Sequence, residues 1–148
     1  MASTTHHHQA GRADTRAISI HASPDHVYDF VSEPQNLPLW AVGFCRSIRP
    51  DDATSDRWLV TTPQGEVPVR YSTDRAHRVV DFHLFPESGQ PVTAHSRVVP
   101  NGDGAEYVFT QLQAPGMPDA VFDAQVTALI EELEVLQRIM AARAACPT

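Results

Sequence analysis

Apolar and polar positions divide the chain into short alternating segments followed by one long helical segment. Residues 17–22 alternate apolar and polar side chains, which is typical of a strand with one buried face. Residues 23–25 (Ser-Pro-Asp) then offer a helix cap, a proline for the first turn and an acidic first-turn residue. The pattern therefore predicts a strand, a short helix to about residue 31 and a second short helix over residues 35–40.

The middle of the chain repeats the alternating pattern between turn residues. Glycine, proline and asparagine gather between the segments, most clearly at residues 101–104 (Asn-Gly-Asp-Gly), which is a strong hairpin signal. Strands are expected at residues 44–49, 57–62, 66–73, 79–85, 91–99 and 105–112. Short strands separated by such turns favour an antiparallel sheet.

The C-terminal segment has a different period. From residue 119 to about residue 143 it contains neither glycine nor proline, and its apolar residues recur every three or four positions. These apolar residues are Phe122, Val126, Leu129, Ile130, Leu133, Leu136 and Met140. The segment is expected to form one long amphipathic helix, so the predicted fold class is α+β, with the helix laid across an antiparallel sheet.

Length and composition indicate one folded domain. A chain of 148 residues, 42% of them hydrophobic and 20% charged, has the composition of a globular protein of single-domain length. Residues 1–14 are small and polar and are expected to form a flexible tail, which leaves residues 15–148 as the domain. We interpret His6 to His8 as part of that tail rather than as a weak metal site or a cloning remnant.

The charged residues exclude several classes of protein. All eleven basic residues are arginine, eighteen residues are acidic, and the net charge is -7. Without lysine, the chain can perform no imine chemistry on a lysine amine and cannot form the phosphate cradle of a P-loop nucleotide hydrolase. The negative charge argues against nucleic acid or an anionic membrane as a partner.

The cysteines and the N-terminus point to a reducing compartment. Cys45 and Cys146 are far apart in the sequence and form no CxxC pair, so neither a disulfide nor a cysteine metal site has support. The N-terminal residues contain no apolar stretch that would serve as a signal peptide or a membrane span. We therefore expect a cytoplasmic protein without membrane insertion.

Six local strings carry a family resemblance. They are residues 20–24 (IHASP), 27–31 (VYDFV), 36–40 (NLPLW), 97–104 (RVVPNGDG), 109–110 (FT) and 115–117 (PGM). Together they resemble the SRPBCC/START (Bet v1-like) superfamily, in particular its polyketide cyclase/dehydrase-like branch. The resemblance covers residues 16–140.

The resemblance implies both a fold and a function. The implied helix-grip fold has a curved antiparallel sheet of about seven strands wrapped on the long C-terminal helix. Two short helices follow the first strand and close one end of a cavity. The implied function is binding of a hydrophobic small molecule there, by a cyclase- or dehydratase-like enzyme that needs neither a metal nor an organic cofactor. The alternative is a non-catalytic carrier or sequestering protein for a lipid-like or aromatic metabolite. In either case we expect a monomer or a homodimer.

Strand alternation indicates which side chains face that cavity. With a two-residue turn at residues 64–65, Trp58 lies opposite Tyr71 on the more apolar face. The expected pocket takes Trp58, Val60, Val69, Tyr71, Phe82, Ser96, Tyr107, Phe109 and Gln111 from the strands, Phe122, Val126, Leu129 and Ile130 from the long helix, and Trp40 and Met117 near the mouth. Tyr71 or Tyr107 would donate a hydrogen bond to a carbonyl or enolate oxygen of a substrate. The competing interpretation is that the aromatic residues only fill the core.

A second set of residues, Asp81, His83, His95 and Arg97, has the composition of an acid–base site. The expected register places Asp81 opposite Arg97 and His83 opposite His95, on the outer and solvated face of the sheet. Glu106 would continue this charged ladder on the next strand. A metal ion is not expected there, because histidines on two adjacent strands supply only two ligands.

The length of the turn at residues 101–104 decides between the two sets. A longer loop would bring Tyr107 and Phe109 onto the same face as His95 and Arg97, because a shift of one residue reverses every side chain. His95 and Arg97 would then replace the tyrosines as the catalytic candidates. Their orientation separates an enzyme, with these residues in the cavity, from a carrier, with these residues in solvent.

Overall fold

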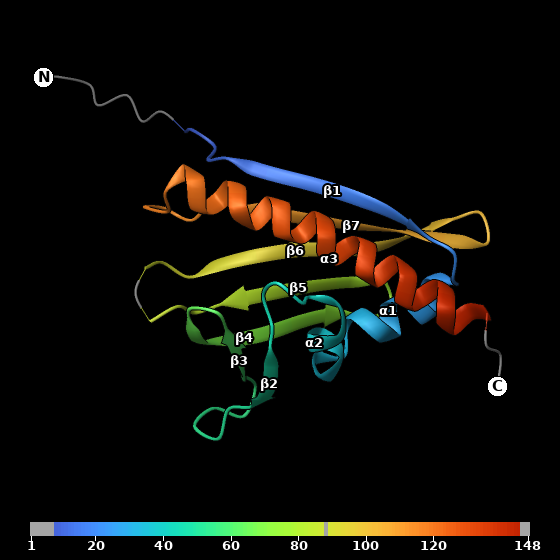
Figure 1. The fold of residues 1–148 in the computed structure, drawn as a ribbon, viewed down its shortest axis with the longest axis horizontal. Helices are drawn as coiled ribbons and strands as arrows, with labels where there is room; N and C mark the ends of the chain where they lie inside the picture. Colours follow the sequence, from blue (N-terminus) through green and yellow to red (C-terminus); the bar gives the residue numbers. More distant parts are fainter. Residues whose placement is uncertain (1–7, 88, 146–148) are drawn as a thin grey trace, which may run out of the picture.

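The computed structural model describes residues 8–87 and 89–145, which form one sheet crossed by a long helix (Figure 1). In chain order the elements are β1 (Ala13–Ile20), α1 (Pro24–Val31), the 3-10 helix η1 (Pro34–Asn36), α2 (Leu37–Trp40), β2 (Ser47–Pro50), β3 (Trp58–Thr62), β4 (Gly65–Asp74), β5 (Val79–Leu84), β6 (Val92–Asn101), β7 (Gly104–Leu112) and α3 (Asp119–Ala145). Helix α3 runs across one face of the sheet (Figure 1). This order confirms the predicted α+β class.

All seven strands belong to one antiparallel sheet with the order β1-β7-β6-β5-β4-β3-β2. Strands β2 to β7 follow one another in the sequence and in the sheet. Strand β1 pairs with β7 along its whole length, from Ala13 opposite Leu112 to Ile20 opposite Ala105. The predicted curved sheet with a long C-terminal helix and two short helices after the first strand is confirmed.

Two strands begin three or more residues from their predicted starts. β1 covers Ala13–Ile20 rather than residues 17–22, so it includes two residues that were expected to belong to the tail. Pairing with β7 supplies backbone partners to these residues, and the alternation of side chains does not report such pairing. β2 begins at Ser47 because residues 41–46 form a turn after α2. His6, His7 and Cys146 lie outside the described residues.

The hairpin registers differ from the prediction by two residues, whereas the predicted faces are correct. Trp58 lies opposite Val69 rather than Tyr71. Asp81 lies opposite His95 rather than Arg97. Because side chains alternate with a period of two, a shift of two residues changes the neighbours of a side chain but not its face.

The turn between β6 and β7 has two residues, so the longer loop considered above is not formed. Asn101 pairs with Gly104, and Gly102 adopts a φ of 57°, a conformation that favours glycine. Arg97 consequently lies opposite Val108 rather than Glu106, and the predicted charged ladder is wrong.

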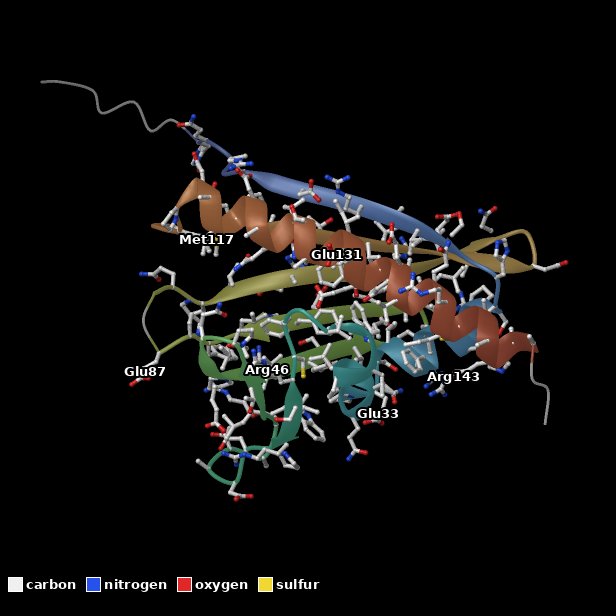
Figure 2. The ribbon with its side chains drawn as sticks, viewed as in Figure 1. Glu33, Arg46, Glu87, Met117, Glu131 and Arg143 are labelled. Atoms are coloured by element: carbon white, nitrogen blue, oxygen red, sulfur yellow. The ribbon has the colours of Figure 1, made fainter. Side chains whose placement is uncertain are left out.

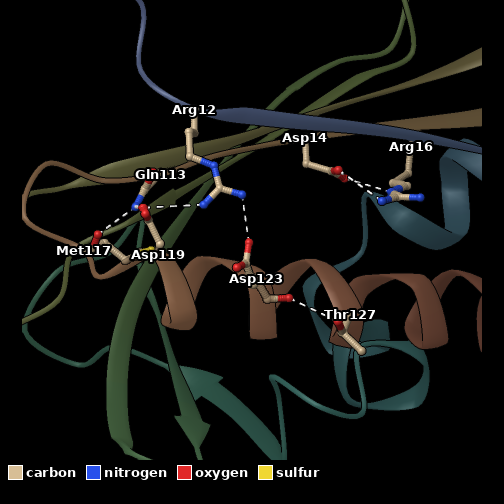
Figure 3. A network of polar contacts seen from close by, with 8 residues as sticks. All are labelled: Arg12, Asp14, Arg16, Gln113, Met117, Asp119, Asp123 and Thr127. Atoms are coloured by element: carbon tan, nitrogen blue, oxygen red, sulfur yellow. Dashed lines mark hydrogen bonds and ion pairs between the residues drawn. The ribbon is translucent and has the colours of Figure 1, made fainter.

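Residues next to the ends of β1 and β7 contact the beginning of α3 (Figure 3). The guanidinium of Arg12 donates to Asp123 Oδ1 at 2.8 Å and lies 3.5 Å from Asp119 Oδ1. Gln113 Nε2 donates to Asp119 Oδ1 and to the Met117 carbonyl oxygen, each at 2.8 Å. The residues before β1 and after β7 are therefore both tied to the first turns of the helix.

The hydrophobic core lies between α3 and the face of the sheet that it covers, which we call the inner face. Side chains occupy the space between the helix and the strands (Figure 2). The largest fully buried side chains include Tyr107, Phe122, Ile20, Leu136 and Val27. In the described part of the chain, no helix is long and apolar enough to cross a membrane.

Candidate functional site

Five aromatic side chains form a continuous chain of ring contacts on the inner face. Trp40, at the end of α2, meets Tyr107 of β7 at 6.0 Å between ring centroids. Tyr107 meets Phe109 at 6.1 Å, and Phe109 stacks on Phe82 of β5 at 5.7 Å. Phe82 in turn meets Tyr71 of β4 edge to face at 4.9 Å. The strands thus bring distant aromatic residues into one apolar surface that faces α3.

The structure places the predicted pocket residues of the strands together on this inner face. Of the whole predicted set, Trp40, Val60, Val69, Phe82, Ser96, Tyr107, Phe109, Phe122 and Leu129 are buried, and Trp58, Tyr71, Gln111, Met117, Val126 and Ile130 are partly buried. Two helix residues face elsewhere. The ring of Phe122 lies under the Arg12 guanidinium at 4.9 Å, and Ile130 lines a separate hollow against β1.

The hydroxyl of Tyr107 already has a hydrogen-bond partner within the protein. It donates to Ser96 Oγ at 2.9 Å, and Ser96 Oγ donates to the Val80 carbonyl oxygen at 2.6 Å. Burial raises the pKa of Tyr107, and the bond to Ser96 opposes that change. Since its proton already has a partner, Tyr107 is the weaker of the two predicted hydrogen-bond donors to a ligand.

Tyr71 and Gln111 differ from Tyr107 because their polar atoms have no partner among the described residues. Tyr71 Oη and Gln111 Oε1 are both buried and accept or donate no hydrogen bond. Burial raises the pKa of Tyr71 well above its usual value. A buried polar atom without a partner costs on the order of 1–3 kcal/mol, so each of these two atoms would gain from a bound polar group.

A buried carboxyl group on α3 was missed in the sequence. Glu132 is 5% exposed, and its Oε2 accepts a hydrogen bond from the Phe44 amide at 3.3 Å. The signal was its spacing, since it lies three residues after Leu129 and four before Leu136 on the buried side of the helix. The carboxyl group thus connects α3 to the turn after α2.

Glu132 titrates in an unusual range because of its surroundings. Burial raises its pKa to about 7. Hydrogen bonds from the amides of Phe44 and Gly43 lower the pKa in part, and the charge of Glu131 raises it further. Its neighbour Cys45 is a free, buried thiol, and burial and the charge of Glu132 raise its pKa to about 11. A carboxyl group with a pKa near neutrality can both donate and accept a proton at physiological pH.

The alternative catalytic set lies on the opposite, outer face of the sheet. His95 Nδ1 lies 3.2 Å from Asp81 Oδ1, and the Arg97 guanidinium donates to the His77 carbonyl oxygen at 3.3 Å. Together with Thr110 these side chains surround a hollow of about 280 Å³ on the outer surface. None of them reaches the aromatic residues of the inner face.

His83 also lies on the outer face, apart from His95. Its Nε2 is 2.9 Å from Ser72 Oγ, and its Nδ1 is 2.8 Å from Thr93 Oγ1. Burial lowers its pKa, and the nearby charge of Arg70 lowers it further. Among the residues described, no group of three histidine, cysteine or acidic side chains has the arrangement of a metal site.

A second hollow lies between β1 and α3. It has a volume of about 180 Å³ and is lined by residues 16–18 of the strand and by Ile130, Leu133 and Glu134 of the helix. It does not reach the aromatic chain. The rings of the inner face pack against one another, and these two hollows lie outside that surface.

Solved structures share this architecture at low sequence identity. Zhui, an aromatase/cyclase from Streptomyces sp. R1128, matches with a TM-score of 0.71 at 11% identity, over 90% of this chain and 95% of its own. A START superfamily protein from Mycobacterium smegmatis matches with a TM-score of 0.70 at 14% identity, over 89% of this chain and 99% of its own. The di-domain ARO/CYC protein BexL, from the BE-7585A biosynthetic pathway, matches with a TM-score of 0.73 at 20% identity, over 92% of this chain and 48% of its own.

Comparison of the sequence alone finds no match. No family profile and no curated protein matches it. The likeness to solved structures nevertheless extends over nearly the whole chain, and it includes the seven-stranded sheet, the two short helices and α3. The chain therefore has the helix-grip fold of the START and aromatase/cyclase proteins, as its sequence resemblance implied.

Proposed function

We propose that the protein binds a hydrophobic small molecule between the inner face of the sheet and α3. The aromatic chain from Trp40 to Tyr71 supplies a large apolar surface, and buried valine and leucine side chains surround it. Small-molecule sites are mostly apolar, with a few polar groups that orient the ligand. Because the rings pack against one another in this structure, a ligand would replace some of these ring contacts.

The observation that carries this proposal is the pair of unpartnered polar atoms on the inner face. The third buried polar atom without a partner among the described residues, Arg70 Nε, belongs to the outer face. Tyr71 Oη and Gln111 Oε1 are buried on strands β4 and β7 without a hydrogen bond in the described structure. A residue that only fills a core needs no polar atom there, and native cores satisfy nearly all such atoms. A ligand with its own polar groups would provide the missing partners.

The outer position of His95 and Arg97 favours a carrier or sequestering role. Catalysis at the inner face would need acid–base groups there, and these two residues with Asp81 belong to the other side of the sheet. A carrier needs only the apolar surface and polar atoms that fix the ligand.

An enzyme is the second candidate, and Glu132 is the observation that supports it. A buried carboxyl group with a pKa of about 7 is suited to move protons at neutral pH. Tyr71 would donate a hydrogen bond to a carbonyl or enolate oxygen, as the resemblance to cyclases and dehydratases implies. Such an enzyme would work by positioning its substrate, without a metal or an organic cofactor.

Native mass spectrometry of the protein purified from its own host tests the binding proposal. We expect a retained apolar small molecule, and less of it on the Tyr71→Phe variant, which lacks the free hydroxyl. Tyr28→Phe is the matched control, since the ring of Tyr28 lies under the Arg75 guanidinium rather than in the aromatic chain. A protein that emerges without any ligand would contradict the proposal.

The same experiment separates the carrier from the enzyme. The retained molecule is extracted and incubated with fresh protein, and its mass and spectrum are followed. An unchanged molecule supports the carrier, whereas conversion that is lost in Glu132→Gln supports the enzyme.

A further inference from the structure

The inner positions of strands β3 to β7 carry no positive charge. Along strands β3 to β7, which the structure describes in full, the inner positions hold no arginine and no histidine. The buried side of α3 holds none either. On the edge strand β1, Arg16 shares the inner face with Phe109, but it is exposed and paired with Asp14 at 2.9 Å. Other arginines lie elsewhere, as in the pairs of Arg49 with Glu66 and Arg75 with Asp29.

Among the described residues, the one buried charged side chain beside this surface is acidic. Glu132 is buried on α3, where it accepts a bond from the Phe44 amide and raises the pKa of the neighbouring Cys45. No arginine forms an ion pair with it in the described structure. An anionic ligand placed between strands β3 to β7 and α3 would therefore meet a buried negative charge, whereas Arg16 on the edge strand is exposed and already paired with Asp14. A buried anion beside a buried carboxylate is strongly unfavourable at low dielectric constant.

The other buried polar atoms also favour a ligand without negative charge. Gln111 Oε1 can only accept a hydrogen bond, and the Glu132 carboxylate can only accept when ionised. Tyr71 Oη can donate or accept. In this arrangement a ligand would satisfy the acceptor atoms with hydrogen-bond donors such as hydroxyl or ammonium groups, which a carboxylate lacks.

We infer that the interior selects neutral or cationic hydrophobic molecules that carry hydrogen-bond donors, and that it rejects hydrophobic anions such as fatty acids and aromatic carboxylates. This inference rests on the proposed binding function and names the chemical class of its ligand. It follows from the charges that face the site rather than from its shape.

Three ligands of one shape and different charge test the inference: 2-naphthol, 2-naphthylmethylamine and 2-naphthoate. At pH 8 they are mostly neutral, cationic and anionic, respectively. We expect calorimetric titration to detect the alcohol and the amine and to show binding of 2-naphthoate weakened by about tenfold or more, the factor that corresponds to about 1.4 kcal/mol.

A variant pair assigns the effect to the buried carboxyl group. Glu132→Gln removes the charge and should bring 2-naphthoate close to 2-naphthol. Glu131→Gln is the matched control, because Glu131 is exposed on the next position of the same helix. It should leave the difference between the ligands unchanged.

A pH series with the unchanged protein provides a second test that does not depend on folding of the variant. The penalty for 2-naphthoate should shrink from pH 8 to pH 6 as Glu132 gains its proton. Of the titratable groups that interact with it, Cys45 has a pKa of about 11 and Glu131 is exposed. Burial keeps Tyr71 protonated.

The outcomes separate the inference from the proposed function. If none of the three ligands binds, the proposed binding function itself is wrong. If 2-naphthoate binds as tightly as 2-naphthol at pH 8, the protein binds hydrophobic molecules and the charge selection is wrong. If the selection persists unchanged in Glu132→Gln and at pH 6, Glu132 is not its source, and the inference is equally overturned.

Discussion

Glu132 is the residue whose protonation should most affect the folded protein. Its carboxyl group is buried, and its pKa rises from 4.5 to about 7 because burial penalises the charged form more than two amide hydrogen bonds favour it. Between these two values the folded protein holds a proton that the unfolded chain has lost. The free energy of unfolding therefore falls as the pH rises from about 4.5 to about 7, and this loss is complete above that range.

The Glu132→Gln variant should remove this dependence. The amide keeps an acceptor for the Phe44 N–H but carries no charge to bury. A pKa change of one unit corresponds to about 1.4 kcal/mol, and the pKa of Glu132 rises from 4.5 to about 7. We therefore expect the unfolding free energy of the variant at pH 8 to exceed that of the original protein by on the order of 3 kcal/mol. Urea unfolding from pH 5 to pH 8 measures the difference. The exposed Glu131→Gln control should keep the pH dependence of the original protein, moved to slightly lower pH because the charge of Glu131 contributes to the raised pKa of Glu132. Parallel curves for all three proteins would refute the expectation.

Ser96 and Tyr107 form a buried pair in which the two members are not equivalent. Ser96→Ala leaves the Tyr107 hydroxyl buried without its acceptor, and we expect a loss of about 1–3 kcal/mol in unfolding free energy. Tyr107→Phe should cost less, since Ser96 still donates to the Val80 carbonyl oxygen. The double variant, measured by denaturant unfolding, should cost less than the sum of the two single losses. Full additivity would mean that the hydroxyl groups act independently.

At the scale of strands, the sequence predicts faces more reliably than registers. Burial of one face fixes the parity of each strand, which is why Tyr71, Phe82 and Phe109 lie on the predicted side. The register depends on where each turn begins, and the predicted turns at residues 64–65 and 101–102 are each displaced by one position in the structure. A displacement of one turn position shifts the pairing by two residues and leaves every face unchanged.

The pairing of β1 with β7 depends on a close backbone contact at Gly104. A Cβ atom there would lie 2.7 Å from the Ile20 carbonyl oxygen, a backbone atom that cannot move aside freely. We therefore expect Gly104→Ala to lower the unfolding free energy by about 1–3 kcal/mol through overpacking. Gly11→Ala, whose nearest such contact is 4.0 Å away, should change it by less than about 0.5 kcal/mol. Equal thermal midpoints for the two variants would contradict this account of the contact.

The first turns of α3 should loosen when Arg12 is replaced. Arg12→Gln removes the ion pairs to Asp119 and Asp123, so amide hydrogen exchange over residues 119–123 should become faster at low ionic strength. These groups are exposed, and at about 1 M salt the difference should disappear because the charges are screened. Arg16→Gln is the control, since Arg16 pairs with Asp14 within β1. Unchanged exchange at low salt would show that these pairs do not hold the helix.

For the whole molecule, the fold could be predicted from the sequence and the candidate site only in part. The alternating segments, the uninterrupted apolar stripe after residue 119 and the family resemblance were enough for the helix-grip architecture. The unpartnered state of Tyr71 Oη was not predictable, because it depends on which side chains meet across strands. Glu132 was overlooked because an acidic residue in an amphipathic helix is expected on the solvated side.

The two faces of the sheet should act independently in ligand binding, because the sheet itself separates them. His95 and Arg97 surround the outer hollow, whereas Tyr71 presents its free hydroxyl at the inner face. We expect His95→Ala and Arg97→Ala to leave the affinity for 2-naphthol unchanged in calorimetric titration. Tyr71→Phe should weaken that affinity about fivefold, which corresponds to the loss of one hydrogen bond of about 1 kcal/mol. A loss of affinity in the outer-face variants together with an unchanged Tyr71→Phe variant would instead place the ligand in the outer hollow, and the inner aromatic surface would then be core alone.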